Sequence, residues 1–431
     1  MNLIINLEHY DYFVNNKLNL SEDEYVYLLP DKNLIFLKSG DKVITINIES
    51  IHFANGEFKQ TIAELLNNKT IVIPDYKTAS LYLPKELLYK AISVENIMRI
   101  KNDPIEVFPY VHSKFKEEKY FEITDFIYRK FNELKDLNKE EIVCQKNFLI
   151  KDIATDILSN SIVYSNSSLA GLFTRKGELY VRKIQYNNKK AVTGRITCSD
   201  KFSLQNLQHV DERRKSIISR FKNGFLVNFD YNSFETRLSM FLTKNEEFIE
   251  KFANKDLHEE TAKIIFDKNI IDKEERGLAK DVNHAIIFGA GKNTVVDILK
   301  EIQEKEDVYK EICKFLHPIM HQEKVLDEEY KKKGYITNYF GGFIYPNKNY
   351  ALYNNYVQSS AADILARKII SVHDILIEYK SKIVAAVHDS ILVDFHPNEE
   401  FLIETIANEM RHVEEFEFSL SHDKMLNLFS E

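Results

Sequence analysis

Residues 225–237 restrict the folds that this chain can adopt more than any other part of its sequence. Their first half is a run of apolar and aromatic residues, which predicts a buried strand. From Phe234 onward the apolar residues recur at helical spacing, which predicts an amphipathic helix. Asp230 stands at the junction, where a rigid strand presents its carboxylate to a cleft, as a divalent cation requires. A helix N-cap or a turn is an equally good interpretation of Asp230 taken alone.

The composition predicts a globular protein of two or three domains, with 431 residues, 44% of them hydrophobic and 29% charged. Three scattered cysteines indicate a reducing compartment without a disulfide framework or a zinc site. No apolar run reaches membrane-spanning length, and residues 1–7 lack a basic leader and a cleavage site. We therefore expect a cytoplasmic protein of a bacterial cell or a phage-infected host, with an organelle as the alternative location. We expect no membrane partner. The net charge of −8 argues only weakly against a nucleic-acid partner, because a basic groove can lie on an acidic protein.

Residues 1–135 predict a small mixed α/β domain, and the rest of the chain predicts mostly helices. The N-terminal strands are expected at 25–29, 34–37, 43–48 and 70–73, and the N-terminal helices at 58–66 and 120–137. Later helices are expected at 148–159, 234–266, 274–288, 293–333 and 354–379, and later strands at 162–164 and 179–185.

A tight hairpin is predicted near the C-terminus, where two apolar strands at 383–387 and 391–395 are separated by His388-Asp389-Ser390. Asp389 therefore stands at a strand junction, as Asp230 does, although the two are 389 − 230 = 159 positions apart. A plain turn aspartate remains the simpler interpretation of Asp389 by itself.

The segment 274–291 predicts a helix on which Arg276, Lys280 and Asn283 share one face, with His284 and Phe288 beside it. Two cations four residues apart, followed by a flat ring, would suit the phosphates and the base of a nucleoside triphosphate. An ordinary solvated helix with ion-paired cations explains the same residues.

Polar and basic residues also gather in loop-like context ahead of the central strand. They are Thr193, Arg195, Gln205, Asn206, Arg213 and Arg214. Such residues can hold a nucleic-acid backbone and minor-groove acceptors without reading sequence, or they can belong to ordinary surface loops.

Together these residues resemble the family A DNA polymerases, the bacterial DNA polymerase I group and its phage-encoded relatives, over roughly residues 140–431. Six motifs carry the resemblance in the family's order and at similar spacing. They are Thr193-Gly194-Arg195 with Leu204-Gln205-Asn206, the segment 230–237, Asp256-Leu257-His258, Arg276 with Lys280 and Phe288-Gly289, the segment 354–363, and Val387-His388-Asp389.

The resemblance implies an α+β multidomain protein with a right-hand polymerase architecture, in which a palm carries an antiparallel sheet. A polymerase domain is expected at 136–431, after an exonuclease-like domain at 1–135. Within it, the expected parts are a reduced thumb and the start of the palm at 136–192, palm at 193–237, fingers at 238–335, and palm with the hairpin at 336–431.

The resemblance also implies the site. Asp230 and Asp389 would hold two Mg²⁺ ions, with Mn²⁺ as a substitute, and Lys280 would act beside them in catalysis. Residues expected to bind the dNTP are Arg276, Lys280, His258, His284, Phe288, Glu235 and Tyr231, with Glu235 excluding the sugar 2′-hydroxyl. Residues expected to bind primer–template DNA are Thr193, Arg195, Gln205, Asn206, Arg213, Arg214, Asn354, Gln358 and His388.

The sequence departs from the family at three of these positions. His284 stands where Phe or Tyr is usual, which puts 3′-deoxy selectivity in doubt. Phe288 replaces a usual Tyr and keeps the stacking ring without its hydroxyl. Ser390 replaces the common acid after Asp389, although two aspartates still suffice for two metal ions.

Two larger departures concern whole domains. Only 193 − 160 = 33 positions separate Asn160 from Thr193, where the family inserts a longer set of thumb helices. A short thumb makes fewer phosphate contacts, so we expect the enzyme to have low intrinsic processivity or to depend on a processivity or replisome partner. The domain at 1–135 resembles a 3′→5′ exonuclease only faintly and lacks clustered acids, with Lys77 and Thr124 where aspartates are expected. We expect no proofreading.

Two alternatives remain. One is a ribonucleotide-tolerant or RNA polymerase-like nucleotidyltransferase, because His388-Asp389-Ser390 resembles the corresponding motif of single-subunit RNA polymerases. Glu235 argues against it. The other is a primer–template-binding protein that has lost its chemistry, which the joint presence of Asp230, Asp389 and Lys280 disfavours.

Overall fold

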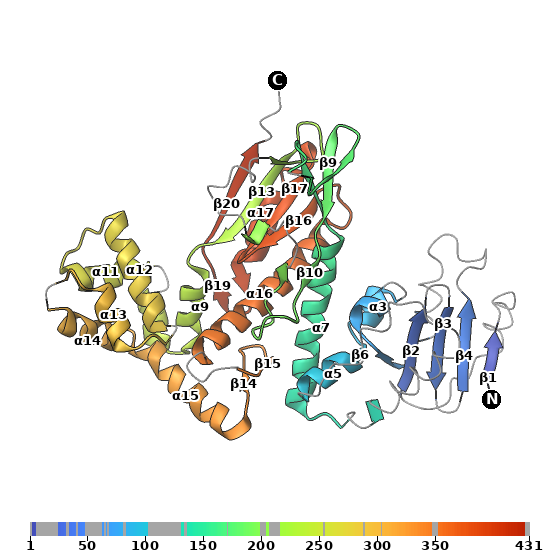
Figure 1. Cartoon of the computed structure of the whole chain (residues 1–431), viewed down its shortest axis with the longest axis horizontal. Helices are drawn as coiled ribbons and strands as arrows, with labels where there is room; N and C mark the ends of the chain where they lie inside the picture. The colour runs from blue at the N-terminus through green and yellow to red at the C-terminus, as the bar shows by residue number, and fades with distance from the viewer. Residues whose placement is uncertain are drawn as a thin grey trace. The chain divides into compact units, whose positions relative to one another are not determined.

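A computed structural model (Figure 1) describes residues 2–5, 25–31, 34–39, 42–47, 63, 66, 69–80, 83–101, 131–132, 136–169, 171–198, 204–206, 216–252, 255–287, 289–302, 304–346 and 352–426. Contacts divide the chain into two compact units, residues 1–153 and 154–431. The division falls inside helix α7 (Lys139–Asn160), and the domain boundary at 135/136 remains a prediction. Within the described ranges, no helix is both long and apolar enough to span a bilayer.

The first unit contains a six-stranded sheet in the order β1-β4-β3-β2-β5-β6. Its strands are β1 (Asn2–Ile5), β2 (Tyr25–Asp31), β3 (Leu34–Ser39), β4 (Lys42–Asn47), β5 (Thr70–Ile73) and β6 (Ile92–Ser93). Its short helices are α3 (Tyr76–Ser80), α4 (Lys85–Leu88) and α5 (Val94–Ile100). The four predicted strands are therefore present, whereas the helices expected at 58–66 and 120–137 lie mostly outside the described residues.

The second unit is built on an antiparallel sheet in the order β16-β17-β13-β20. These strands are β13 (Phe225–Tyr231), β16 (Lys382–Val387), β17 (Ser390–Phe395) and β20 (Leu420–Leu426). All six residues of β17, an inner strand, are buried, and the long helix α16 (Leu352–Leu376) and helix α17 (Leu402–Arg411) pack against β16 and β20 of the same sheet (Figure 1). The predicted strand at 225–231 and the predicted hairpin are both confirmed.

A run of helices leaves the central sheet after β13 (Figure 1). They are α9 (Phe234–Leu242), α10 (Glu246–Phe252), α11 (Leu257–Phe266), α12 (Lys273–Ile287), α13 (Lys292–Ile298), α14 (Lys305–Phe315) and α15 (His317–Lys333). Helices are expected at 234–266, and the structure has three there: Lys244 adopts a positive φ of 53°, and Asn245 caps a new helix through Phe248 N (2.9 Å). The helix expected at 293–333 is likewise broken, at Glu304 (φ 53°) and again before α15.

Smaller elements complete the second unit. A four-stranded sheet has the order β12-β7-β9-β8, and two-stranded ladders join β10 to β11, β14 to β15 and β18 to β19. Their bounds are β7 (Ile162–Ser165), β8 (Thr174–Lys176), β9 (Leu179–Lys183), β10 (Tyr186–Asn187), β11 (Thr197–Cys198), β12 (Ile217–Ile218), β14 (Ile336–Thr337), β15 (Phe343–Ile344), β18 (His412–Val413) and β19 (Phe416–Glu417). Short 3₁₀ helices are η4 (Leu204–Asn206) and η6 (Pro397–Glu399). The α+β fold class is therefore confirmed.

Candidate active site

The two predicted metal-binding aspartates meet at one end of the central sheet. In the β13–β17 ladder, Asp230 is the partner of Ser390, and Asp389 directly precedes Ser390 in the turn from β16. The pairing of Val387 with Ser390 leaves only His388 and Asp389 in that turn, so it is tighter than the three-residue tip expected from sequence. His388 has a φ of 55°, which a non-glycine residue adopts in tight hairpin turns at some cost.

Negative charge accumulates at this end of the sheet. The pKa of Asp389 is raised from 3.8 to about 6, chiefly by burial and then by the charges of Asp230 and Glu235, while Lys280 opposes the rise. Asp230 lies inside the strand, and the N-cap position of α9 belongs to Ser233, so the N-cap interpretation of Asp230 is wrong. Because the ionised carboxylate is destabilised at this site, binding of a cation there would be favourable.

The two aspartates fit Mg²⁺ only as part of a larger ligand set. Among the described residues, no three His, Cys, Asp or Glu side chains are grouped so that they alone could hold a metal ion. Mg²⁺ is commonly bound by one or two carboxylates together with substrate phosphates and water. The donors present, hard carboxylate oxygens from Asp230 and Asp389, therefore match an ion that arrives with a phosphate-bearing substrate.

Glu235 lies in the first turn of α9, close to Asp230 in sequence, and faces Arg195 across 3.8 Å. Burial raises the pKa of Glu235, and the positive charge of Arg195 counteracts the rise. This contact thus connects Glu235, which is expected to lie against the sugar of the dNTP, with Arg195, which is expected to bind the DNA. Tyr231 is placed differently: it is buried, its ring stacks on Phe234, and its hydroxyl donates to Met410 O (2.6 Å). A contact between Tyr231 and a nucleotide remains a prediction.

Helix α12 carries the predicted phosphate-binding cations on one face. Arg276 donates from Nε (2.9 Å) and Nη2 (2.6 Å) to Oδ2 of Asp256, which stands at the N-cap of α11. The other oxygen of Asp256 accepts from the backbone N–H groups of His258 and Glu259. Although burial raises the pKa of Asp256, the contacts with Arg276 hold it below its ordinary value. Sequence reasoning gave Asp256 no role of its own, although an N-cap acid just before a predicted helix is a readable signal.

Lys280 lies one turn beyond Arg276 and is exposed. Its charge lowers the pKa of Asp389 and, after burial as the larger cause, the pKa values of His258 and His284. Lys280 is therefore within electrostatic reach of Asp389, and its role in catalysis remains a prediction.

His258 is the most deeply buried of the predicted nucleotide-binding residues, at 1% exposure. Asn283 Nδ2 contacts its Nδ1 (3.0 Å), and Thr236 Oγ1 contacts its Nε2 (3.4 Å). Thr261 donates to Asn283 Oδ1 (2.9 Å), which extends this polar network across α9, α11 and α12. Burial lowers the pKa of His258 to about 4, so the ring is neutral near pH 7. A contact of His258 with a triphosphate remains a prediction.

The residues expected to bind DNA occupy varied surroundings. Thr193 is buried, whereas Arg195 and His388 are exposed. Gln205 donates to Ile196 O (3.0 Å) and Ala386 O (3.4 Å), so it ties η4 to β16 just before the catalytic turn. Asn354 lies on the same face of α16 as half-buried Gln358, and its buried Oδ1 has no hydrogen-bond partner among the described residues. The side chain of Asn206, and Arg213, Arg214 and Phe288, lie outside the described residues.

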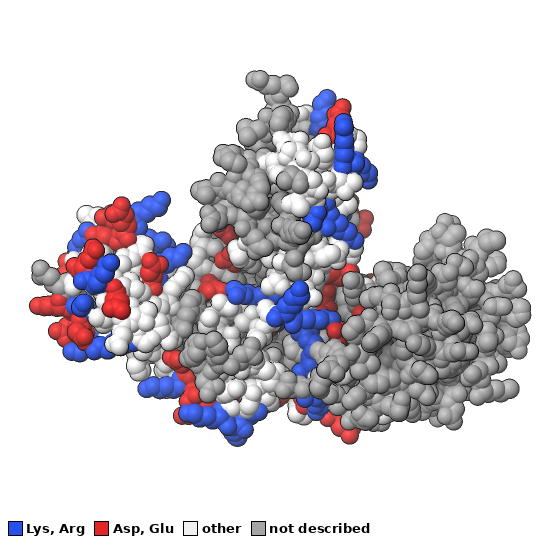
Figure 2. Space-filling model, viewed as in Figure 1, with Lys and Arg blue, Asp and Glu red and all other residues white. Residues whose placement is uncertain are grey.

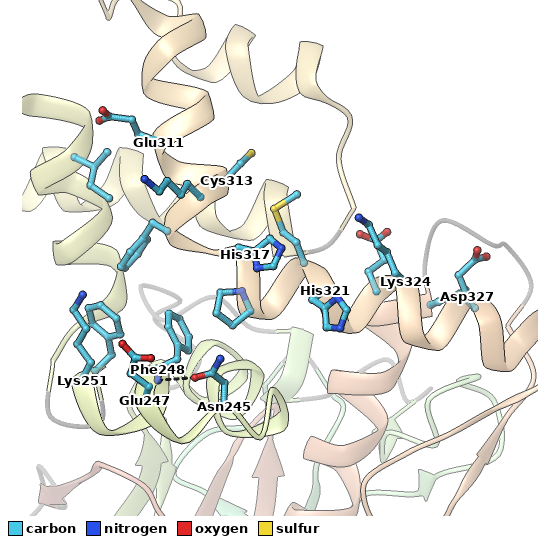
Figure 3. A pocket seen from close by; sticks show the side chains of 18 residues that line it. Asn245, Glu247, Phe248, Lys251, Glu311, Cys313, His317, His321, Lys324 and Asp327 are labelled. Atoms are coloured by element: carbon cyan, nitrogen blue, oxygen red, sulfur yellow. Dashed lines mark hydrogen bonds between the residues drawn. The ribbon is translucent and has the colours of Figure 1, made fainter.

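A groove of about 1180 Å³ lies between α10, α14 and α15, and none of its lining residues is a predicted site residue (Figure 3). Glu247 and Lys251 line it from α10, and His317 and His321 stand side by side on α15 (Figure 3). Acidic, basic and aromatic side chains all line this groove, and this mixture indicates no particular class of ligand. The candidate site is therefore the acidic end of the central sheet, which faces Lys280.

Known proteins resemble this chain across the second unit. The family described as DNA polymerase family A matches residues 174–425, more than half of the chain. DNA polymerase I of Caldicellulosiruptor bescii is 29% identical over 267 residues, which cover 57% of this chain and 31% of that protein. The thermostable DNA polymerase I of Thermus thermophilus is 28% identical over 250 residues, 51% of this chain and 28% of that protein. This chain thus spans less than a third of the length of these relatives.

A solved structure shares the fold. It is the POL domain of Pol1 from M. smegmatis in complex with DNA primer-template and dNTP, with a TM-score of 0.66 at 14% sequence identity. The similarity covers 98% of each chain. The expected polymerase-domain fold is therefore confirmed.

Proposed function

The chain belongs to DNA polymerase family A, and from this premise we propose that it adds dNTPs to a primer 3′-hydroxyl on a DNA template and releases pyrophosphate. The observation that carries the proposal is the convergence of Asp230 and Asp389 on one end of the central sheet, with Lys280 in electrostatic reach. The reaction would be an in-line attack of the 3′-hydroxyl on the α-phosphate. The substrates would be dNTPs and primer–template DNA, and the proposed location is the cytoplasm.

Asp230 and Asp389 would hold two Mg²⁺ ions, or Mn²⁺ in their place. When bound, such ions lower the pKa of the attacking hydroxyl and stabilise the leaving pyrophosphate. Lys280 would lie against the phosphates, neutralise the charge that develops there and donate a proton to the leaving group. Arg276, oriented by Asp256, would hold the triphosphate tail through the guanidinium N–H groups that Asp256 leaves unused.

Glu235 would crowd the 2′ position of the incoming sugar, and Arg195 would keep its carboxylate in place at the 3.8 Å separation found here. This steric role favours DNA synthesis over the RNA polymerase-like alternative. The DNA-binding roles of Asn354, Gln358 and His388 follow from the same proposal. We further propose that the enzyme does not proofread and that its processivity is low without a partner.

Primer extension on a defined template tests the proposal. We expect the wild-type chain to incorporate each templated dNTP in the presence of Mg²⁺ and to prefer dNTPs over rNTPs. Asp389→Ala should abolish extension while primer–template binding persists, and Asp297→Ala, an exposed aspartate of α13, should have no effect. Extension by Asp389→Ala would refute the metal assignment, and a wild-type chain that binds DNA without extending it would favour the inactive-binder alternative.

A second assay addresses processivity and proofreading. In the presence of a DNA trap, we expect short products from a single encounter, and long products would contradict the proposed low processivity. A single-stranded 3′ end should stay intact without dNTPs. Degradation that is lost on mutation within residues 1–135 would show that this domain is a nuclease.

A further inference from the structure

Residues 174–195 carry the strongest local charge bias that the sequence places near the candidate site. They contain seven basic residues (Arg175, Lys176, Arg182, Lys183, Lys189, Lys190 and Arg195) and one acid (Glu178), for a local net charge of 7 − 1 = +6. The whole chain has a net charge of −8. This segment therefore opposes the charge of the rest of the molecule, a pattern typical of a surface that meets a polyanion.

The basic segment forms a projecting hairpin. Strands β8 and β9 pair through Thr174–Val181, Arg175–Tyr180 and Lys176–Leu179, and β8 is the outer strand of its sheet. All three residues of β8 are exposed, and the Lys and Arg side chains gather over this end of the molecule in Figure 2. An edge strand that is exposed along its whole length and rich in cations resists pairing with another strand, yet remains open to an anionic ligand.

Two cations of this hairpin donate to uncharged groups. Arg175 Nε donates to Gly177 O (3.1 Å), and Lys183 Nζ donates to Asn160 Oδ1 (2.8 Å), which are both uncharged acceptors. Among the residues that the structure describes, Arg175, Lys176, Lys183 and Lys190 form no ion pair with a carboxylate. By contrast, the exposed cations Lys310 and Lys331 on α14 and α15 are paired with acids.

The basic segment also leads into the candidate site. Tyr186, the first residue of β10, hydrogen-bonds the backbone of Ala386, three residues before Asp389. At the end of the segment, Arg195 lies 3.8 Å from Glu235. The hairpin is therefore anchored next to the turn that carries Asp389, and its cations extend outward from that point.

We infer that the β8–β9 hairpin and the following turn grip the phosphate backbone of the primer–template duplex as it leaves the site, in place of part of a longer thumb. The inference rests on the proposed function. A five-residue strand such as β9 spans roughly 16 Å at about 3.3 Å per residue, which matches about five base pairs of B-form DNA. The contacts would be to phosphates and would carry no sequence preference.

A charge-neutralised hairpin variant tests the inference. The variant combines Arg175→Gln, Lys176→Gln and Lys183→Gln, and the matched control combines Lys300→Gln, Lys314→Gln and Lys332→Gln, three exposed lysines on other elements. The dissociation constant for a primer–template should be measured between 50 and 300 mM salt, with thermal melting and far-UV circular dichroism to establish that both variants fold.

We expect the hairpin variant to bind a primer–template with a 12-base-pair duplex about 10- to 100-fold more weakly, and the slope of log affinity against log salt to fall by about 2 to 3. Binding of a 4-base-pair duplex should change little, because the inference places the hairpin beyond the reach of so short a duplex. The maximal rate of single-nucleotide incorporation at saturating DNA should match wild type, and the control should resemble wild type throughout.

Unchanged affinity and salt slope in the folded variant would overturn the inference. Unchanged DNA binding together with loss of stimulation by an acidic protein would overturn it in favour of a protein partner at this surface. An equal loss of affinity with both duplex lengths would also overturn it, since it would place the cations at the primer end. These outcomes are distinct from failure of the proposed function, which would appear as absence of incorporation by the wild-type chain.

Discussion

The carboxyl groups of Asp230, in β13, and Asp389, in the turn between β16 and β17, share one end of the central sheet, and the charge of Asp230 adds to burial in raising the pKa of Asp389 to about 6. The ordinary pKa of this group is 3.8, so the ionised form is less stable in the folded chain than in the unfolded chain. The site is thus electrostatically unfavourable until a cation enters it.

This repulsion predicts that Asp389→Asn stabilises the metal-free protein. A carboxyl with a raised folded-state pKa contributes stability that is fully present below pH 4 and is lost as the pH rises through about 6. The shift of about two pKa units corresponds to at most about 3 kcal/mol. We therefore expect the variant to unfold with a free energy about 1–3 kcal/mol higher at pH 8, and with no such gain at pH 4. Urea denaturation in EDTA measures this, and an equal gain at both pH values would contradict the explanation.

The Asp256–Arg276 pair predicts a selective effect on substrate binding. Asp256→Asn keeps an N-cap acceptor for α11 but removes the charge that orients the guanidinium. We expect KM for dNTP to rise about 3- to 10-fold with little change in kcat, because the lost interaction helps bind the triphosphate in ground and transition states alike. Asp272→Asn is the control, since Asp272 caps α12 without an arginine partner among the described residues. A fall in KM would indicate that Asp256 competes with the triphosphate for Arg276.

The position of Glu235 predicts that its truncation relaxes sugar selection. Glu235→Ala removes the side chain that is expected to occupy the space of a 2′-hydroxyl, so we expect the ratio of kcat/KM for dNTP over rNTP to fall by about 10²-fold or more. Single-nucleotide incorporation with matched dCTP and CTP measures the ratio. Glu247→Ala on α10 should leave it unchanged. Retained discrimination in Glu235→Ala would assign the selection to another residue.

The buried network around His258 predicts a stability cost at Asn283, which is fully buried. Asn283→Ala would leave the ring of His258 and the hydroxyl of Thr261 without their amide partner, which costs about 1–3 kcal/mol. Thermal unfolding measures the loss, with Asn293→Ala, an exposed position, as the control. A loss below about 0.5 kcal/mol would mean that water replaces the amide.

The sequence was sufficient to predict the central strand and the hairpin, because their apolar runs are continuous and bounded by turn residues. Both aspartates could be identified, but only the family resemblance implied that they meet, since 159 positions separate them and the pairing of β13 with β17 brings them together. Periodicity also failed to show the helix breaks at Lys244 and Glu304, because neither is a glycine or a proline.

Side-chain partners were harder to predict than elements. The sequence placed Arg276 and His258 at a triphosphate, and the structure shows Arg276 bound to Asp256 and His258 enclosed by Thr236 and Asn283. Spacing along a helix determines which residues share a face, but it does not determine which neighbouring helix that face meets. The basic bias of residues 174–195 is visible in the sequence, whereas the hairpin that displays it depends on the pairing of β8 with β9.

The register of β13 against β17 limits how this protein can change over evolutionary time. Side chains alternate between the faces of a sheet, so a one-residue insertion in either strand would turn Asp230 to the opposite face from Asp389. A residue added at the exposed Gly177-Glu178 turn of the β8–β9 hairpin would meet no such restriction. We expect length variation among close homologues to be excluded from the two central strands and to accumulate at that turn.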